Sequence, residues 1–67
     1  MAEGIIRTLK LSAGNGVRFG FVTCPGKDDL RFEESDLVGV EMTADLRGRR
    51  VTYNEAGGRA ERVRLLD

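Results

Sequence analysis

Three closely spaced turn signals constrain the fold of this chain more than any other feature of its sequence. They are Gly14-Asn15-Gly16, Cys24-Pro25-Gly26 and Asn54-Glu55-Ala56-Gly57-Gly58. Asn-Gly accepts the positive φ angles of a tight hairpin, and Pro followed by Gly has the order found in type II turns. β-Branched and aromatic residues lie between the turns, and no long segment has the period of an amphipathic helix. The sequence therefore predicts an all-β fold.

Five short strands are predicted between these turns, at residues 4–11, 17–24, 29–33, 49–54 and 59–65. Segment 34–48 separates the third strand from the fourth, and Ser35 before Asp36-Leu37 predicts a single capped 3₁₀ or helical turn there. The 67 residues suffice for one domain, 1–67. Five strands in so short a chain favour a closed or nearly closed barrel, because closure removes exposed strand edges.

Side-chain alternation assigns the core face of the third strand but not that of the second. Leu30 and Phe32 point to the same side and are predicted to lie in the core. In the second strand, Phe19 and Phe21 share one face, whereas Val22 lies on the other. Either both phenylalanines are inside and Val22 is exposed, or Val22 is inside and both phenylalanines are on the surface. The residue pattern is compatible with both arrangements.

Composition excludes most catalytic and metal-binding chemistry. The chain has no His and one Cys, so His-based catalysis, His-ligated metals and multi-thiolate metal sites are all excluded. The acidic residues of segment 28–36 lack the spacing of a calcium loop. Cys24 has no His or second Cys beside it and is predicted to be a passive thiol. We therefore expect a domain that is not an enzyme and uses no metal or cofactor.

Charges balance over the whole chain but not along it. Lys and Arg number 11, as do Asp and Glu, which gives a net charge of zero. Basic residues dominate segments 1–27 and 46–67, whereas acidic residues dominate segment 28–45, so local fields can persist. No apolar run approaches the roughly 20 residues of a membrane helix, and the N-terminus does not have the pattern of a signal peptide. The expectation is a cytoplasmic protein without a membrane partner.

The second predicted strand carries a motif that is similar to that of a known family. Arg18-Phe19-Gly20-Phe21-Val22 resembles the first ribonucleoprotein motif of cold-shock domains. The resemblance continues along nearly the whole chain in Gly4-Ile5-Ile6-Arg7, Lys27-Asp28-Asp29-Leu30, Ser35-Asp36-Leu37, Leu46-x-Gly48-x-x-Val51-x-Tyr53 and Gly58-x-Ala60-x-x-Val63. This resemblance implies a small five-stranded antiparallel OB-fold barrel, similar to a cold-shock domain.

The chain departs from the family pattern where the family places its stacking aromatic residues. Thr8-Leu9 replaces a Trp-Phe pair, and the second ribonucleoprotein motif reads Leu30-Arg31-Phe32-Glu33-Glu34. In that motif the inward positions remain apolar, but the outward ones hold Arg and Glu in place of aromatic residues and His. The loop between the first two strands is also longer. The core of the fold is retained, whereas most of the stacking platform is lost.

The resemblance implies that bases of single-stranded RNA or DNA stack on the two phenylalanines of the first motif, within a basic surface. The predicted nucleic-acid-binding residues are Phe19, Phe21, Arg7, Lys10, Arg18 and Arg31. Each stacked base contributes roughly 1–3 kcal/mol, so two give about 2–6 kcal/mol, whereas a millimolar complex needs about 4 kcal/mol. The prediction is therefore weak, sequence-tolerant nucleic-acid binding.

A second function is compatible with the same departures. Arg31, Glu33 and Glu34 replace the stacking platform with charges suited to a protein–protein interaction module on a cold-shock-like scaffold. An acidic patch can meet a basic partner, and an exposed pair of phenylalanines can drive weak association. We therefore expect a monomer or a weak homodimer, with single-stranded RNA or DNA as its first partner and another protein as the alternative.

Overall fold

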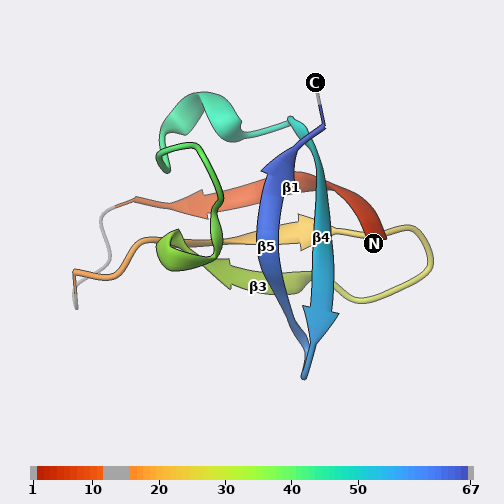
Figure 1. The fold of residues 1–67 in the computed structure, drawn as a ribbon. Helices are drawn as coiled ribbons and strands as arrows, with labels where there is room; N and C mark the ends of the chain where they lie inside the picture. Colours follow the sequence, from red (N-terminus) through yellow and green to blue (C-terminus); the bar gives the residue numbers. More distant parts are fainter. Residues whose placement is uncertain (1, 12–15, 67) are drawn as a thin grey trace.

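The predicted all-β fold is confirmed in a computed structural model that describes residues 2–11 and 16–66 (Figure 1). Across these residues the strands are β1 (Ala2–Lys10), β2 (Phe19–Thr23), β3 (Leu30–Glu33), β4 (Arg50–Ala56) and β5 (Arg59–Leu65). Two short 3₁₀ turns, η1 (Glu34–Asp36) and η2 (Ala44–Leu46), lie between β3 and β4. The predicted hairpin residues Gly14 and Asn15 lie outside the described residues. No helix in the described ranges is long and apolar enough to cross a membrane.

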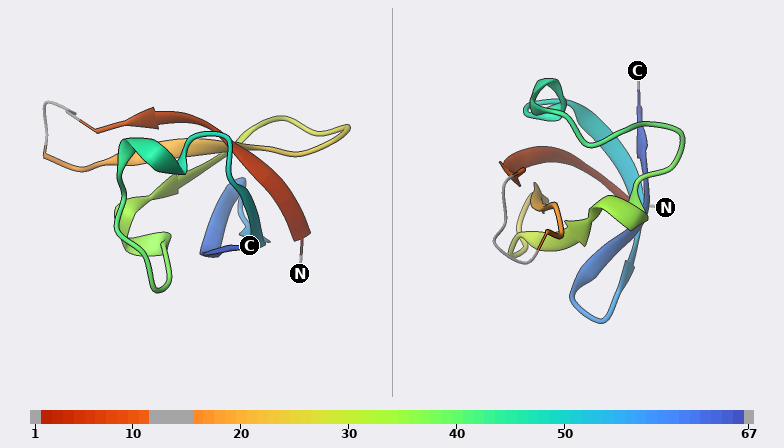
Figure 2. Two further views of the ribbon diagram at one scale, coloured as in Figure 1. Left: turned by 90° about the horizontal axis from the view of Figure 1, so that it is seen from above. Right: turned by 90° about the vertical axis from the view of Figure 1, so that its left-hand side faces the viewer.

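The strands form a closed barrel in the order β1-β2-β3-β5-β4. Figures 1 and 2 show the β4–β5 hairpin crossing the β1–β2–β3 sheet, which brings β5 beside β3. Neighbouring strands of the described chain are antiparallel except β3 and β5, which pair in parallel at Arg31 and Arg59. A closed ring of five strands cannot alternate direction all the way round, so one parallel pair is unavoidable. The small antiparallel barrel is thus confirmed, with this one exception, and is consistent with an OB-like fold.

The barrel interior settles the face of the second strand. Gly20 and Val22 are buried, whereas Phe19 and Phe21 are half-buried on the outside. Leu30 and Phe32 lie inside, as their alternation predicts. The buried hydrophobic side chains of the described chain are Ile6, Leu9, Val22, Cys24, Leu30, Phe32, Met42, Leu46, Val51, Tyr53, Ala60 and Val63. The core therefore forms without the two phenylalanines of the first motif.

Two β-bulges bury apolar residues that simple alternation would place on opposite faces. In β1, Ile6 and Leu9 are three residues apart, yet both are buried, because the register with β2 shifts between Ile6 and Thr8. In β5, Ala60 and Val63 are likewise both buried, and the register with β4 shifts beside them. The extra residue of each bulge reverses the alternation that follows it. Neither bulge was predicted from the sequence.

Arg62 lies in the β5 bulge and has a φ angle of 50°, in the left-handed region. A side chain with a Cβ is strained there by roughly 1–2 kcal/mol, whereas glycine is not. Glycine also gives the unfolded chain more conformational freedom, which lowers the free energy of unfolding by about 0.5–1 kcal/mol. We therefore expect Arg62→Gly to stabilise the barrel slightly, by about 0.5–1 kcal/mol in urea unfolding. A clear loss of stability would mean that the bulge is not held in this conformation.

The predicted turn after the third strand is confirmed as η1, but Ser35 is not its cap. Glu33 is the N-cap residue, and its side chain accepts the backbone N–H of Asp36. In return, the Asp36 carboxylate accepts the backbone N–H of Glu33 at 2.8 Å. This reciprocal capping box satisfies two backbone donors at once. It also places both carboxylates at the end of β3.

Cys24 and Tyr53 meet inside the barrel. Both side chains are buried, and the Cys24 Sγ is hydrogen-bonded to the Tyr53 hydroxyl oxygen. Burial, followed by this hydrogen bond, raises the pKa of the Tyr53 hydroxyl to about 12. The pairing gives the buried hydroxyl a partner, which a polar atom in an apolar interior requires.

Candidate nucleic-acid interface

The predicted stacking residues lie on the outer surface of the three-stranded sheet formed by β1, β2 and β3. Strand pairing aligns their side chains in two rows, because Phe21 lies opposite Thr8 and Arg31, and Phe19 lies opposite Lys10 and Glu33. We call this surface the β1–β2–β3 outer face, defined by Thr8, Lys10, Phe19, Phe21, Arg31 and Glu33. It offers two neighbouring aromatic rings between basic and acidic side chains.

The two aromatic rings contact each other edge to face. Their centroids are 6.0 Å apart and their planes meet at 83°. The guanidinium carbon of Arg31 lies over the Phe19 ring, 4.4 Å from its centroid, which is a cation–π arrangement. Arg31 also forms an ion pair with Glu33, at 3.4 Å between Nη2 and Oε2. A planar cation thus covers one side of the Phe19 ring.

The other predicted basic residues are spread around this face. Lys10 lies in the row of Phe19. Arg7 sits at the β1 bulge and forms a long ion pair with Asp29, at 4.0 Å. Arg18 forms an ion pair with Glu34 at 3.6 Å and donates a hydrogen bond to the Met42 carbonyl at 3.5 Å. The structure therefore brings Lys10 and Arg31 to the rings, whereas Arg18 reaches toward the segment that follows η1.

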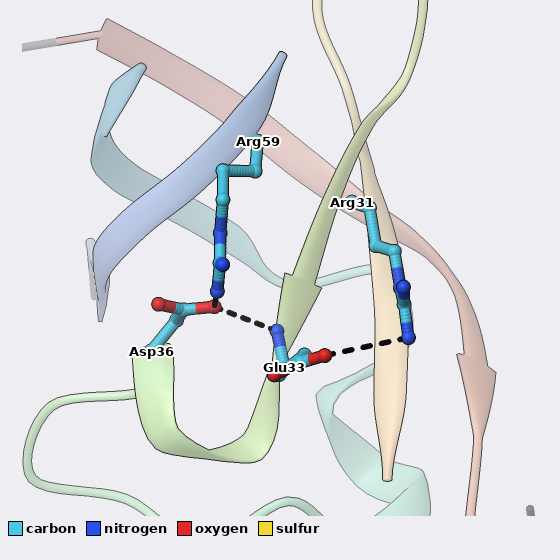
Figure 3. Close-up of polar contacts among 4 residues, drawn as sticks. All are labelled: Arg31, Glu33, Asp36 and Arg59. Carbon is cyan, nitrogen blue, oxygen red and sulfur yellow. Dashed lines mark hydrogen bonds and ion pairs between the residues drawn. The ribbon is translucent and has the colours of Figure 1, made fainter. Parts of the chain in front are cut away.

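Sequence reasoning missed Arg59 on β5 as a direct neighbour of this surface. The parallel pairing of β3 and β5 places Arg59 directly beside Arg31. Its Nη2 donates to the Asp36 carboxylate at 2.7 Å, and this hydrogen bond raises the pKa of the Arg59 guanidinium (Figure 3). The sequence carries no signal for this position, because the two arginines are adjacent only after the barrel closes.

No three His, Cys, Asp or Glu side chains gather as a metal site within residues 2–11 and 16–66. The outer face presents two half-buried aromatic rings flanked by charged side chains. Comparison of the chain with protein-family models gives no match, and neither does a search of the curated proteins.

Proposed function

We propose that this chain is a cold-shock-like barrel that binds single-stranded RNA or DNA weakly and with little sequence preference. The observation that carries the proposal is the position of Phe19 and Phe21, which lie on the outer face although both are large apolar residues. Base stacking on aromatic rings beside basic groups is the usual way in which such barrels hold single strands. We further propose that it acts in the cytoplasm, as a monomer or weak homodimer, without catalysis or cofactor.

The charges of the outer face support weak rather than tight binding. Lys10 and Arg31 attract the phosphate backbone, whereas Glu33 lies in the same row as Phe19 and repels it. Stacking on two rings contributes about 2–6 kcal/mol before the strand is ordered. The net affinity is therefore expected in the millimolar range, with a marked loss as salt rises.

Replacing Phe21 by alanine tests the stacking surface. We expect Phe21→Ala to weaken binding of oligo-dT and oligo-U about five- to 150-fold, because one stacked base is worth roughly 1–3 kcal/mol. The measurement is a two-dimensional NMR titration of the labelled protein at low and then physiological salt. Val38→Ala is the matched control, since Val38 is 39% exposed but lies outside the outer face. Binding that survives Phe19→Ala combined with Phe21→Ala would contradict the proposal.

One observation favours a protein partner as the second candidate. Glu33 pairs with Arg31 and Glu34 pairs with Arg18, so this end of the face presents balanced charges. A protein-interaction module would leave millimolar oligonucleotide without effect. Its complex would instead weaken on charge reversal at Glu33 or Glu34.

A further inference from the structure

Two arginines face each other across the place where the barrel closes. Arg31 on β3 and Arg59 on β5 are direct cross-strand neighbours. Like charges in this position normally destabilise a sheet. Figure 3 shows what offsets this charge repulsion. Arg59 forms an ion pair with Asp36 of η1, and Arg31 forms an ion pair with Glu33 at the end of β3. Each arginine of this cross-strand pair is therefore already paired with a carboxylate.

The two carboxylates differ in how firmly they are held. The Asp36 side chain is 11% exposed, lies 2.7 Å from Arg59 and accepts the backbone N–H of Glu33. The Glu33 side chain also accepts a backbone N–H, that of Asp36, but it is 34% exposed and lies 3.4 Å from Arg31. A partly exposed pair at this distance exchanges readily with other anions, because its net contribution is small. The contact of Glu33 with Arg31 is thus the replaceable one, whereas the contact of Asp36 with Arg59 is the firmer one.

A hollow of about 80 Å³ lies at the same place, lined by Arg31, Glu33 and Arg59. Guanidinium groups are planar and carry several N–H donors, so two of them around one hollow match the oxygens of a phosphate. The Arg31 guanidinium also covers Phe19, so the hollow adjoins the ring on which a base is proposed to stack.

We propose that Arg31 and Arg59 form a phosphate subsite of the β1–β2–β3 outer face, and that Glu33 occupies it in the free protein. A phosphodiester group of the bound strand displaces the Glu33 carboxylate from Arg31 and is shared with Arg59. Glu33 is then an internal competitor that sets the affinity for nucleic acid. This inference rests on the proposed function, since it assigns the phosphate contact of the same face.

Glu33→Gln tests the competition directly. Glutamine keeps an oxygen that can accept the Asp36 backbone N–H, so the capping box of η1 is retained. Removal of the competing charge is expected to tighten oligo-dT binding about fivefold, the upper range for an exposed ion pair. Glu55→Gln is the matched control, because Glu55 forms an ion pair with Lys27 at the same distance of 3.4 Å. An equal gain in both variants would reveal a general charge effect and overturn the proposal.

Arg59→Gln tests the second half of the subsite. It is expected to weaken oligo-dT binding and to reduce the slope of log K against log salt by about 0.7, the value for one phosphate contact on a single strand. In the Arg59→Gln background, the gain from Glu33→Gln is expected to shrink well below fivefold. Thermal unfolding of each variant verifies that the barrel is intact. An unchanged salt slope in folded Arg59→Gln would exclude Arg59 from the subsite.

Inorganic phosphate separates failure of the subsite from failure of the proposed function. In Glu33→Gln, phosphate is expected to shift the side-chain N–H signals of Arg31 and Arg59 more than in the parent protein. If these signals move but oligo-dT does not bind, the subsite stands and the proposed function fails. If oligo-dT binds through Phe21 but neither phosphate nor Glu33→Gln has an effect, the function stands and the subsite is overturned.

Discussion

Gly20→Ala is expected to destabilise the barrel by about 3 kcal/mol or more, although it adds a single methyl group. A Cβ atom at Gly20 would lie 2.5 Å from the carbonyl oxygen of Thr8 and 2.9 Å from Cδ2 of Leu9, both on β1. It would also lie 3.1 Å from Cε1 of Phe32. The shortest of these contacts is to backbone, which cannot rotate away as a side chain can. Strand β1 would have to move, and the rows of the outer face would move with it.

Urea unfolding measures this loss, and Gly26→Ala is its matched control. Gly26 has a φ angle of 72°, and a Cβ atom there would meet no atom within 4 Å. Alanine at Gly26 therefore suffers only backbone strain, of about 1–2 kcal/mol. A Gly20→Ala variant as stable as the Gly26→Ala variant would show that β1 and β2 do not approach as closely as described.

Alkaline pH is expected to remove about 3 kcal/mol of stability through the ionisation of Tyr53. Its pKa is about 12 in the folded protein, against 10.0 for a free tyrosine, because burial and the hydrogen bond to Cys24 favour the neutral hydroxyl. Between pH 10 and about pH 12, the folded protein therefore keeps the proton of the Tyr53 hydroxyl, which the unfolded chain has lost. The stability that Tyr53 contributes is complete below pH 10 and is lost as pH rises through about 12. Its size follows from the pKa difference, since a difference of one corresponds to about 1.4 kcal/mol.

The single tyrosine of the chain makes this measurement specific. Ultraviolet absorbance of tyrosinate reports the ionisation of Tyr53 alone, and urea unfolding at several pH values reports the stability. Tyr53→Phe is the control: it loses the hydrogen bond to Cys24 at every pH but cannot ionise. We expect the stability of the parent protein to fall more steeply than that of Tyr53→Phe above pH 10. Parallel curves, or ionisation of Tyr53 near pH 10, would contradict the buried pairing.

The fold was predictable wherever alternation and turn signals agree. Leu30 and Phe32 alternate with charged residues, so their burial followed directly from the sequence. Segment 19–22 has apolar residues on both faces, and the packing that leaves no room for a Cβ at Gly20 becomes visible only once β1 and β2 are paired. The bulges that bury Ile6 with Leu9, and Ala60 with Val63, depend on strand register, which a single sequence does not reveal.

The candidate site was predictable where its residues belong to strands that are close in sequence, but not where it depends on closure of the barrel. Phe19, Phe21 and Arg31 were predicted as binding residues, and strand pairing between β2 and β3 places them together, although their role in binding stays a prediction. The position of Arg59 depends on contacts between strands that are distant in sequence. The ion pair between Arg31 and Glu33 depends on rotamers, which the order of residues does not fix.

The single parallel pairing of the described strands has a dynamic consequence. Residues 31 and 59 form the one direct pair between β3 and β5, and the bridge between Leu37 and Val63 extends it. If β3 and β5 separate, the closed barrel becomes an open sheet in the order β3-β2-β1-β4-β5, and every antiparallel pairing is kept. Separation of β3 from β5 therefore breaks fewer backbone pairings than separation of any other two neighbouring strands. Local unfolding starts at such weakly paired sites. A phosphate bound by both Arg31 and Arg59 would link β3 to β5. Binding of a nucleic-acid strand would therefore stabilise the closed form of the barrel.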